Sequence, residues 1–305
     1  MRLFDESALR RLEQLTLAAE SVRVGVMKGD RRSRKRGTSI EFADYRDYAQ
    51  GDDLRRLDWN VFARLDRPFI KLTEEEEDLA VHILIDSSDS MNWPRADEAT
   101  ATNKLVYALR LAAALGSIGL LAGDLVAVML LDSSGRRAWG PFRGRANNWP
   151  LLQFLEAQYE MLTAAESSPR GTTLDLSLRD YALRARRPGL LFLLSDLFSR
   201  GDYRTGLSAI LARGYEVALL HILSPDEVAP DLAGDLRLLD VESGEAAEIT
   251  IDPTTQEGYA EALESWRQGI DAFCAPRGVH YAPIATDTPW DAVIWQILRR
   301  QGVVR

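Results

Sequence analysis

The sequence predicts an α/β fold in which helices flank a doubly wound, mostly parallel sheet. Several short segments are apolar at every position rather than at alternate positions, which is typical of strands covered on both faces. From residue 79 onward these segments alternate with helical patterns, as expected for repeated strand–helix units. With 305 residues, 46% of them hydrophobic and 27% charged, the chain has the composition of a folded globular protein. Its length allows one large or two modest domains.

The main domain is predicted to span residues 79–305. Its strands are expected at 80–86, 125–131, 189–194, 216–223 and 279–284. Its helices are expected at 104–122, 148–162, 173–185, 205–213, 257–274 and 290–299. Residues 236–250 break this rhythm and have the pattern of a β-hairpin around Ser243 and Gly244, because Ser-Gly is a common turn dipeptide.

Residues 1–78 are predicted to form an N-terminal α+β extension packed on the main domain. Leucines between charged residues at 6–19 indicate a surface helix with one apolar stripe. Residues 69–73 have the pattern of a strand, and Trp59 is expected in a core. Because no Gly/Ser-rich or Pro-rich linker separates this part from residues 79–305, we expect the two parts to pack together.

The charge balance excludes a general nucleic-acid-binding protein. The chain has 46 acidic and 37 basic residues and a formal net charge of −9, whereas binding to polyanions needs a positive field. One basic run, residues 28–36, holds six basic residues and one acidic residue. Two interpretations of this run stay open: a solvated loop, or an arm for an acidic partner, nucleic acid or anionic lipid.

The sequence also indicates a cytoplasmic protein. Cys274 is the single cysteine, so no disulfide can form within the chain, which fits a reducing compartment. The N-terminus lacks the basic-then-apolar pattern of a signal peptide. The longest apolar stretch, 111–123, is shorter than the ~20 residues that span a bilayer. We therefore interpret it as part of a buried helix and expect a soluble protein without membrane insertion.

Polar side chains follow the predicted strands at their carboxyl ends, where open α/β sheets bind ligands. The first strand ends in Asp86, and Ser88 and Ser90 follow at spacings of two. Asp196 follows the third strand, and Thr172 lies before a helix. Hard ions such as Mg²⁺ or Mn²⁺ prefer this oxygen-only donor set. Because hydroxyls are neutral, most of the ion's charge would stay uncompensated and would attract a carboxylate from a partner.

This pattern resembles the metal-ion-dependent adhesion site of von Willebrand factor type A domains. All five motif positions are filled in the order of that family, and the similarity covers about residues 79–305. The resemblance implies a von Willebrand factor A-like fold with these five side chains as metal ligands. Thr173 is an alternative to Thr172 as the fourth ligand in chain order, since either hydroxyl could face the ion. Taken singly, the serines and the threonine could equally be helix caps or turn formers.

Aromatic residues and paired charges are dense between residues 38 and 68. The motifs there are Glu41-Phe42, Tyr45-Arg46-x-Tyr48, Gly51-Asp52-Asp53-x-Arg55, Asp58-Trp59 and Ala63-Arg64. They resemble the bacterial family catalogued as domain of unknown function 58. The resemblance implies a MoxR-type AAA+ ATPase as partner, and chaperone-like assembly or metal insertion on a protein client. We therefore expect a non-enzymatic, divalent-metal-dependent protein-binding module.

The charged side chains of this segment have two interpretations. Asp52, Arg55, Asp58 and Arg64 fit either a structural charge network or a surface for a partner. A loop at 92–102 is expected to lie over the metal site, because the distance from Ser90 to the next helix is long for a direct turn.

An enzyme is the alternative function. A metal-dependent phosphate-ester hydrolase would use Asp86 and Asp196 as metal ligands. Phosphatases of the haloacid dehalogenase type need a second aspartate where this chain has Ser88. The chain has no Gly-x-x-x-x-Gly-Lys-Ser/Thr motif for binding ATP phosphates. The three histidines, His82, His221 and His280, are interpreted as packed strand residues rather than catalytic bases.

Overall fold

The chain divides into two compact units. The computed structural model describes residues 10–19, 41–49, 57–74, 79–94, 102–131, 137–164, 173–184, 187–199, 201–239 and 245–305. The larger unit comprises Met1–Val26 and Leu79–Arg305, and the smaller unit comprises Met27–Asp78. The sequence predicts one N-terminal extension of residues 1–78, whereas in the structure Met1–Val26 belongs to the larger unit.

The smaller unit has a two-stranded antiparallel sheet and a short helix. Strand β1 (Glu41–Asp47) pairs with β2 (Phe69–Glu74), which confirms the strand predicted at 69–73. Helix α2 (Trp59–Leu65) begins after Asp58, whose carboxylate accepts the backbone N–H groups of Asn60 and Val61. The expectation that Trp59 belongs to a core is wrong, since 63% of this residue is exposed.

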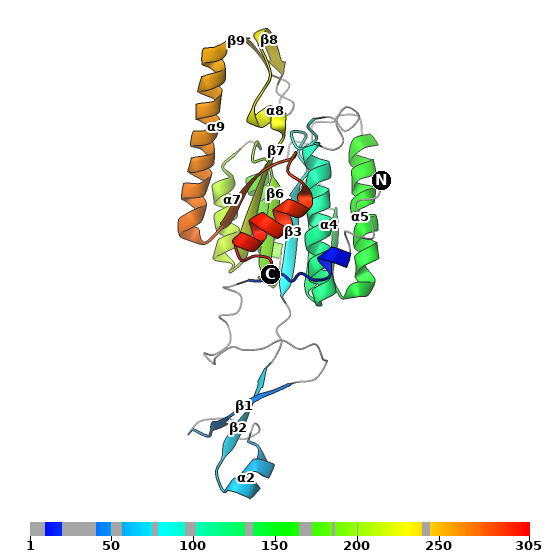
Figure 1. Cartoon of the computed structure of the whole chain (residues 1–305), viewed down its shortest axis with the longest axis vertical. Coiled ribbons are helices and arrows are strands. Elements are labelled where there is room, and N and C mark those ends of the chain that lie inside the picture. The colour runs from blue at the N-terminus through cyan, green and yellow to red at the C-terminus, as the bar shows by residue number, and fades with distance from the viewer. Residues whose placement is uncertain are drawn as a thin grey trace. The chain divides into compact units, whose positions relative to one another are not determined.

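The larger unit is built on a six-stranded sheet in the order β10-β7-β6-β3-β4-β5 (Figure 1). The strands are β3 (Ala80–Asp86), β4 (Leu125–Leu131), β5 (Ala138–Arg143), β6 (Leu190–Ser195), β7 (Glu216–Leu223) and β10 (His280–Ala285). All neighbours are parallel except the edge strand β5, which is antiparallel to β4. This doubly wound order confirms the predicted von Willebrand factor A-like α/β class.

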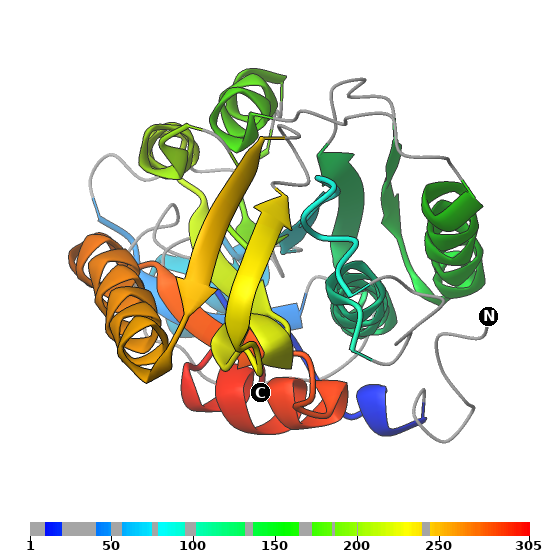
Figure 2. The same ribbon diagram turned by 90° about the horizontal axis from the view of Figure 1, so that it is seen from above.

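Helices cover both faces of this sheet (Figure 2). The helices are α4 (Lys104–Ala122), α5 (Asn148–Ala164), α6 (Leu174–Arg184), α7 (Tyr203–Ala212), α9 (Pro253–Cys274), α10 (Trp290–Ala292) and η5 (Val293–Leu298). In β3, Ile83 and Ile85 pack in one core with α4, α5 and η5, whereas Leu84 packs in a second core with α6, α7 and α9. Every residue of β3 is buried, which explains its continuous apolar pattern.

Helix α4 is the central helix of the first core. Asn103 caps its N-terminus by accepting the Val106 N–H, and Gly123 ends it with a φ of 94° that favours glycine. By length and composition this helix could cross a membrane, but most of it is buried within the fold. The prediction of a buried helix is therefore confirmed, and its first residue, Lys104, is buried as well.

The N-terminal segment differs from the helix predicted at 6–19. Within the described range 10–19, only residues 10–12 are helical. At Leu17 the backbone is extended. Leu17 forms an isolated antiparallel bridge with Val304, and the backbone of Thr16 exchanges hydrogen bonds with that of Arg305. The C-terminal strand-like segment thus fixes backbone groups that a longer helix would have paired internally.

A β-hairpin follows the carboxyl end of β7. A short helix, α8 (Pro225–Val228), leads into β8 (Gly234–Leu239), which pairs antiparallel with β9 (Ala246–Ile251). The predicted hairpin is therefore confirmed, although its turn at Ser243 and Gly244 lies outside the described residues. The hairpin and α8 lie beyond the carboxyl end of the sheet (Figure 1).

Candidate metal centre

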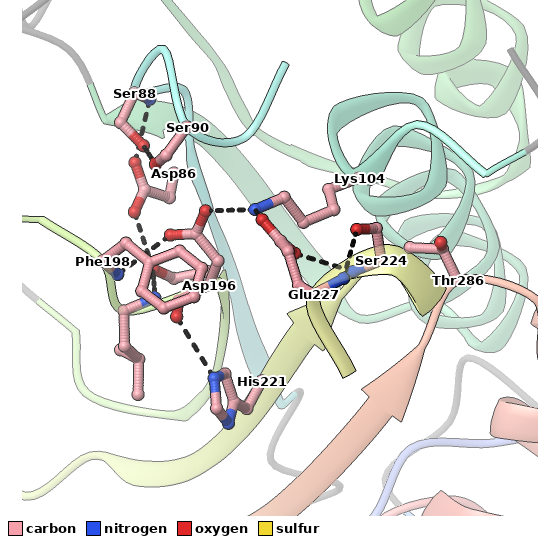
Figure 3. Close-up of polar contacts among 12 residues, drawn as sticks. Asp86, Ser88, Ser90, Lys104, Asp196, Phe198, His221, Ser224, Glu227 and Thr286 are labelled. Atoms are coloured by element: carbon pink, nitrogen blue, oxygen red, sulfur yellow. Dashed lines mark hydrogen bonds and ion pairs between the residues drawn. The ribbon is translucent and has the colours of Figure 1, made fainter. Parts of the chain in front are cut away.

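Two buried aspartates meet at the carboxyl end of the sheet (Figure 3). Asp86 is the last residue of β3, and Asp196 directly follows β6. The two strands are parallel neighbours, so their carboxyl ends lie side by side. Asp86 is 1% exposed and Asp196 is fully buried. Two carboxylates in the interior are costly unless protons, hydrogen bonds or cations compensate their charge.

Hydrogen bonds fix both oxygens of Asp86. Oδ1 accepts the Ser88 backbone N–H at 3.0 Å, and Oδ2 accepts the Ser195 hydroxyl at 2.6 Å. Burial and, secondarily, the negative charge of Asp196 raise the pKa of Asp86 from its ordinary value to about 6. A nearby cation would stabilise the ionised form that these hydrogen bonds already orient.

The hydroxyls of Ser88 and Ser90 form a close pair beside Asp86. Their oxygens share a hydrogen bond at 3.0 Å, and both residues are buried. Adjacent ligands of an octahedral Mg²⁺ ion at ~2.1 Å are separated by roughly 3 Å. The pair therefore has the spacing of two neighbouring ligands on one ion.

Asp196 is bound by a buried lysine. Its Oδ2 accepts a hydrogen bond from Lys104 Nζ at 2.7 Å, and its Oδ1 accepts the Phe198 N–H at 3.0 Å. Lys104 Nζ also donates to Glu227 Oε1 at 2.6 Å, and neither the lysine nor the aspartate side chain is exposed. Such short charge-assisted hydrogen bonds hold both carboxylates in one orientation.

Glu227 is fixed by the first turn of α8. Its Oε2 accepts the Ser224 N–H at 2.8 Å, and Ser224 Oγ accepts the Glu227 N–H at 3.3 Å, which forms a capping box. Lys104 therefore connects Asp196 to the element that leads into the β8–β9 hairpin.

The cluster keeps a net negative charge. Asp86, Asp196 and Glu227 contribute three carboxylates, and Lys104 contributes one ammonium, which leaves about −2 when all are ionised. His221 adds no positive charge at neutral pH, because burial lowers its pKa to about 4. A divalent cation would neutralise the cluster, so these residues fit Mg²⁺ or Mn²⁺ in both charge and donor type. The expectation that most of the ion's charge stays uncompensated is therefore wrong, because ionised Asp86 and Asp196 together balance it, and a partner carboxylate would bind through an open coordination position.

The predicted metal ligands are brought together with one exception. Asp86, Ser88, Ser90 and Asp196 lie in one cluster, whereas Thr172 lies outside the described residues. Thr173 directly precedes α6, where its carbonyl accepts the Ser177 N–H at 3.1 Å. Within the described part of the chain, no group of three or more His, Cys, Asp or Glu side chains could hold a metal ion. A metal centre here therefore depends on hydroxyl oxygens.

The predicted charge network of the smaller unit is only partly visible. Asp52 and Arg55 lie outside the described residues. Asp58 serves as the N-cap of α2, and Arg64 lies in the exposed last turn of that helix. Asp58 therefore has a local role as a helix cap, and the choice between a charge network and a partner surface stays a prediction.

Three residues of the cluster were not predicted: Lys104, Ser195 and Glu227. Lys104 had a signal in the sequence, because it is the one charged residue in the first turn of a mostly apolar helix. A lysine there either reaches solvent or pairs with a buried acid, and the structure has the second arrangement. Ser195 and Glu227 had no comparable signal, since their partners are distant in sequence.

The base of the loop beside the site is well fixed. Asn103 Nδ2 donates to Asn92 Oδ1 at 3.0 Å and to the Pro94 carbonyl at 2.7 Å. The Lys104 N–H donates to the Trp93 carbonyl at 2.9 Å. The two ends of the loop predicted at 92–102 are thus held together next to Ser90, whereas residues 95–101 lie outside the described residues.

The fold and this cluster define an α/β domain of the von Willebrand factor A-like class with a candidate metal centre at the carboxyl end of its sheet. The chain belongs to the family described as protein of unknown function DUF58, whose model matches residues 44–269.

Relatives in mycobacteria match nearly all or part of the chain. The uncharacterized protein Rv1480 of Mycobacterium tuberculosis (strain H37Rv) is 28% identical over 302 residues, which is 98% of this chain and 90% of that protein. The uncharacterized protein MAV169 of Mycobacterium avium is 32% identical over 142 residues, 45% of this chain and 83% of that protein.

Solved structures resemble the chain more distantly. The conserved hypothetical protein BatB of Bacteroides thetaiotaomicron has a TM-score of 0.39 and 15% identity, and the match covers 73% of this chain and 98% of that one. The pilus adhesin SpaC of Lactobacillus rhamnosus GG, in its open conformation, has a TM-score of 0.37 and 13% identity over 76% of this chain and 31% of that one. Both scores are too low to support a statement about function.

Proposed function

We propose that the chain is a non-enzymatic protein-binding module that uses Mg²⁺ or Mn²⁺ to bind an acidic residue of a partner. The observation that carries this proposal is the Ser88–Ser90 hydroxyl pair, 3.0 Å apart, beside two buried aspartates. A bound ion would supply an open coordination position for the partner's carboxylate. The two serine hydroxyls would hold the ion, Asp86 and Asp196 would compensate its charge, and Thr172 would complete the set.

The polar contacts of the cluster favour binding over hydrolysis. Both oxygens of Asp86 accept hydrogen bonds, which hold the carboxylate in one orientation. Both ring nitrogens of His221 are also engaged, Nδ1 with Tyr281 Oη at 2.8 Å and Nε2 with the Asp196 carbonyl at 3.1 Å. A general base needs a nitrogen that reaches the substrate, and His221 is fully buried. The same hydrogen bonds hold the cluster rigidly, as a binding site for an ion requires.

The resemblance to the DUF58 family supports a MoxR-type AAA+ ATPase as the partner, acting with this chain on a protein client in the cytoplasm. An AAA+ ATPase supplies ATP-driven motion, and this chain would supply the contact that selects a client or places it. A buried, preformed acidic cluster suits this role, because it can bind an ion and a carboxylate without rearranging.

Calorimetric titration tests the proposal directly. The full chain is titrated with a MoxR-type ATPase from the same genome, once with Mg²⁺ and once with chelator. We expect binding with Mg²⁺ and a loss of affinity with chelator. The double variant Ser88→Ala, Ser90→Ala removes the two hydroxyls without adding bulk, so it should fold and bind weakly in both conditions. Ser208→Ala is the matched control. Ser208 is exposed on α7, and its hydroxyl donates to the Arg204 carbonyl of the same helix.

Two results would contradict the proposal. Equal affinity with Mg²⁺ and with chelator would mean that no ion bridges the two proteins. Turnover of a generic phosphate ester that requires Mg²⁺ and is lost in Asp86→Ala would favour the metal-dependent phosphate-ester hydrolase.

A further inference from the structure

An exposed aromatic ring lies at the edge of the candidate metal centre. Phe198 is two residues beyond Asp196, and 41% of it is exposed. Its backbone N–H donates to Asp196 Oδ1, so the residue is attached to the cluster itself (Figure 3). A single exposed apolar side chain is common on protein surfaces, so what distinguishes Phe198 is its attachment to the polar cluster.

The ring is fixed although it is exposed. It stacks on Trp266 of α9, with ring centroids 5.3 Å apart and an angle of 10° between the planes. Trp266 in turn packs against the His221 ring in a T-shaped arrangement, with ring centroids 4.8 Å apart. The Lys104 ammonium lies 5.0 Å from the centroid of the Phe198 ring. A ring held in this way loses little conformational entropy when a partner binds it.

The backbone that presents the ring is strained. Leu197 has a φ of 59°, in the left-handed region that non-glycine residues rarely adopt. The Leu197 N–H donates to Ser195 Oγ at 2.9 Å, and the next N–H, of Phe198, donates to Asp196 Oδ1. These two hydrogen bonds hold the turn in place. Strain of this kind persists where the surroundings fix the conformation, and it is common at functional sites.

We infer that Phe198 is the apolar half of a two-part recognition site. The ion would bind an aspartate or glutamate of the partner, and Phe198 would contact an aromatic or branched aliphatic side chain beside that acid. This inference rests on the proposed function and specifies its partner: a protein segment with an acidic residue next to a large apolar one. Phe198 then determines specificity, whereas Ser88 and Ser90 provide the ion-dependent contact.

Selection from a phage-displayed library of random peptides tests the inference. The full chain is immobilised in Mg²⁺, and bound phage are eluted with chelator. We expect the eluted peptides to carry Asp or Glu next to Trp, Phe, Tyr, Leu or Ile. A synthetic peptide from this set should bind Phe198→Ala about tenfold more weakly than the unchanged chain, the loss of one anchoring side chain at an interface.

Control variants separate the contributions. Phe142→Ala is a control of similar exposure, because Phe142 is 47% exposed. Phe142 pairs with Val126 near the amino end of β4, so it lies at the end of the sheet opposite the candidate metal centre. It should bind the peptide unchanged. Phe198→Leu keeps an apolar side chain and should retain most of the affinity. Mg²⁺ affinity, measured without peptide, should be the same in Phe198→Ala as in the unchanged chain.

The possible failures are distinguishable. Chelator-eluted peptides with acidic residues but no apolar neighbour would overturn the inference and leave the proposed function standing. The peptide sequences give this result even if Phe198→Ala does not fold. The absence of any chelator-eluted peptide would overturn the proposed function and this inference together.

Discussion

The Lys104 ammonium lies 2.7 Å from Asp196 Oδ2 with both side chains fully buried. The same ammonium lies 2.6 Å from Glu227 Oε1, so one cation holds two carboxylates from separate elements. A buried pair of this kind contributes little net stability relative to an apolar core, but removing one partner leaves an uncompensated charge in the interior. Lys104 therefore determines both the charge of the candidate metal centre and the stability of its surroundings.

Replacing Lys104 with Met should destabilise the chain strongly. The variant keeps most of the apolar stem but leaves Asp196 and Glu227 without their cation. We expect the free energy of unfolding in chelator to fall by about 3–5 kcal/mol, measured by urea denaturation at neutral pH. Adding Glu227→Gln to Lys104→Met should recover part of this loss, because one of the orphaned charges is removed. Equal stability of Lys104→Met and the unchanged chain would contradict the assigned ion pairs.

Acid should destabilise the fold through His82. Its Nε2 lies 3.0 Å from the Arg187 carbonyl and therefore carries the proton, and its Nδ1 accepts from the Tyr181 hydroxyl at 2.6 Å. Burial lowers the pKa of His82 from 6.5 to about 4. The stabilisation from this neutral histidine is present above pH 6.5 and is lost as the pH falls toward 4. Its full size is on the order of 3 kcal/mol.

Denaturation of the unchanged chain and of His82→Gln, compared across pH 4 to 7, measures this effect. The difference between the two should shrink as the pH falls. Asp86 acts in the opposite direction, because its raised pKa costs stability as the pH rises through about 6. That contribution is common to both proteins and cancels in the difference. A constant difference over the whole range would contradict a buried neutral His82.

The N-terminal segment should be essential to the larger unit. Leu12 is fully buried in the first core, and Leu17 is bridged to Val304. Leu12→Ala should lower the free energy of unfolding by about 2–5 kcal/mol, the range for deleting a fully buried leucine side chain. The exposed neighbour Gln14→Ala is the control and should change stability little. If Leu12→Ala were as stable as Gln14→Ala, residues 10–19 would not be part of this core.

The central strands could be predicted from the sequence because burial determines their composition. The predicted bounds of β3, β4 and β7 agree with the structure, since every position of β3 and β7 is buried and every position of β4 is buried or partly buried. The edge strand β5 was not predicted. It contains Gly140 and Pro141 and is mostly exposed, so it lacks both the β-propensity and the apolar pattern of a strand.

The site could be predicted only where its ligands follow strand ends. Asp86, Ser88, Ser90 and Asp196 were found because the carboxyl ends of parallel strands meet in space. The bond from Lys104 to Glu227 joins residues 123 positions apart, and no local pattern encodes such a pairing. The extended form of residue 17 likewise depends on Val304, so the leucine stripe at 6–19 favoured a helix that the C-terminus prevents.

Titration with Mn²⁺ tests whether the cluster at Asp86 and Asp196 binds a divalent ion. Electron paramagnetic resonance of the free ion counts bound Mn²⁺ without any partner protein. We expect one bound Mn²⁺ per chain, displaced by excess Mg²⁺, absent from the double variant Ser88→Ala, Ser90→Ala, and unchanged in Ser208→Ala. Far-ultraviolet circular dichroism of the double variant should match that of the unchanged chain. Equal Mn²⁺ binding by a folded double variant and the unchanged chain would contradict a metal centre at these serines.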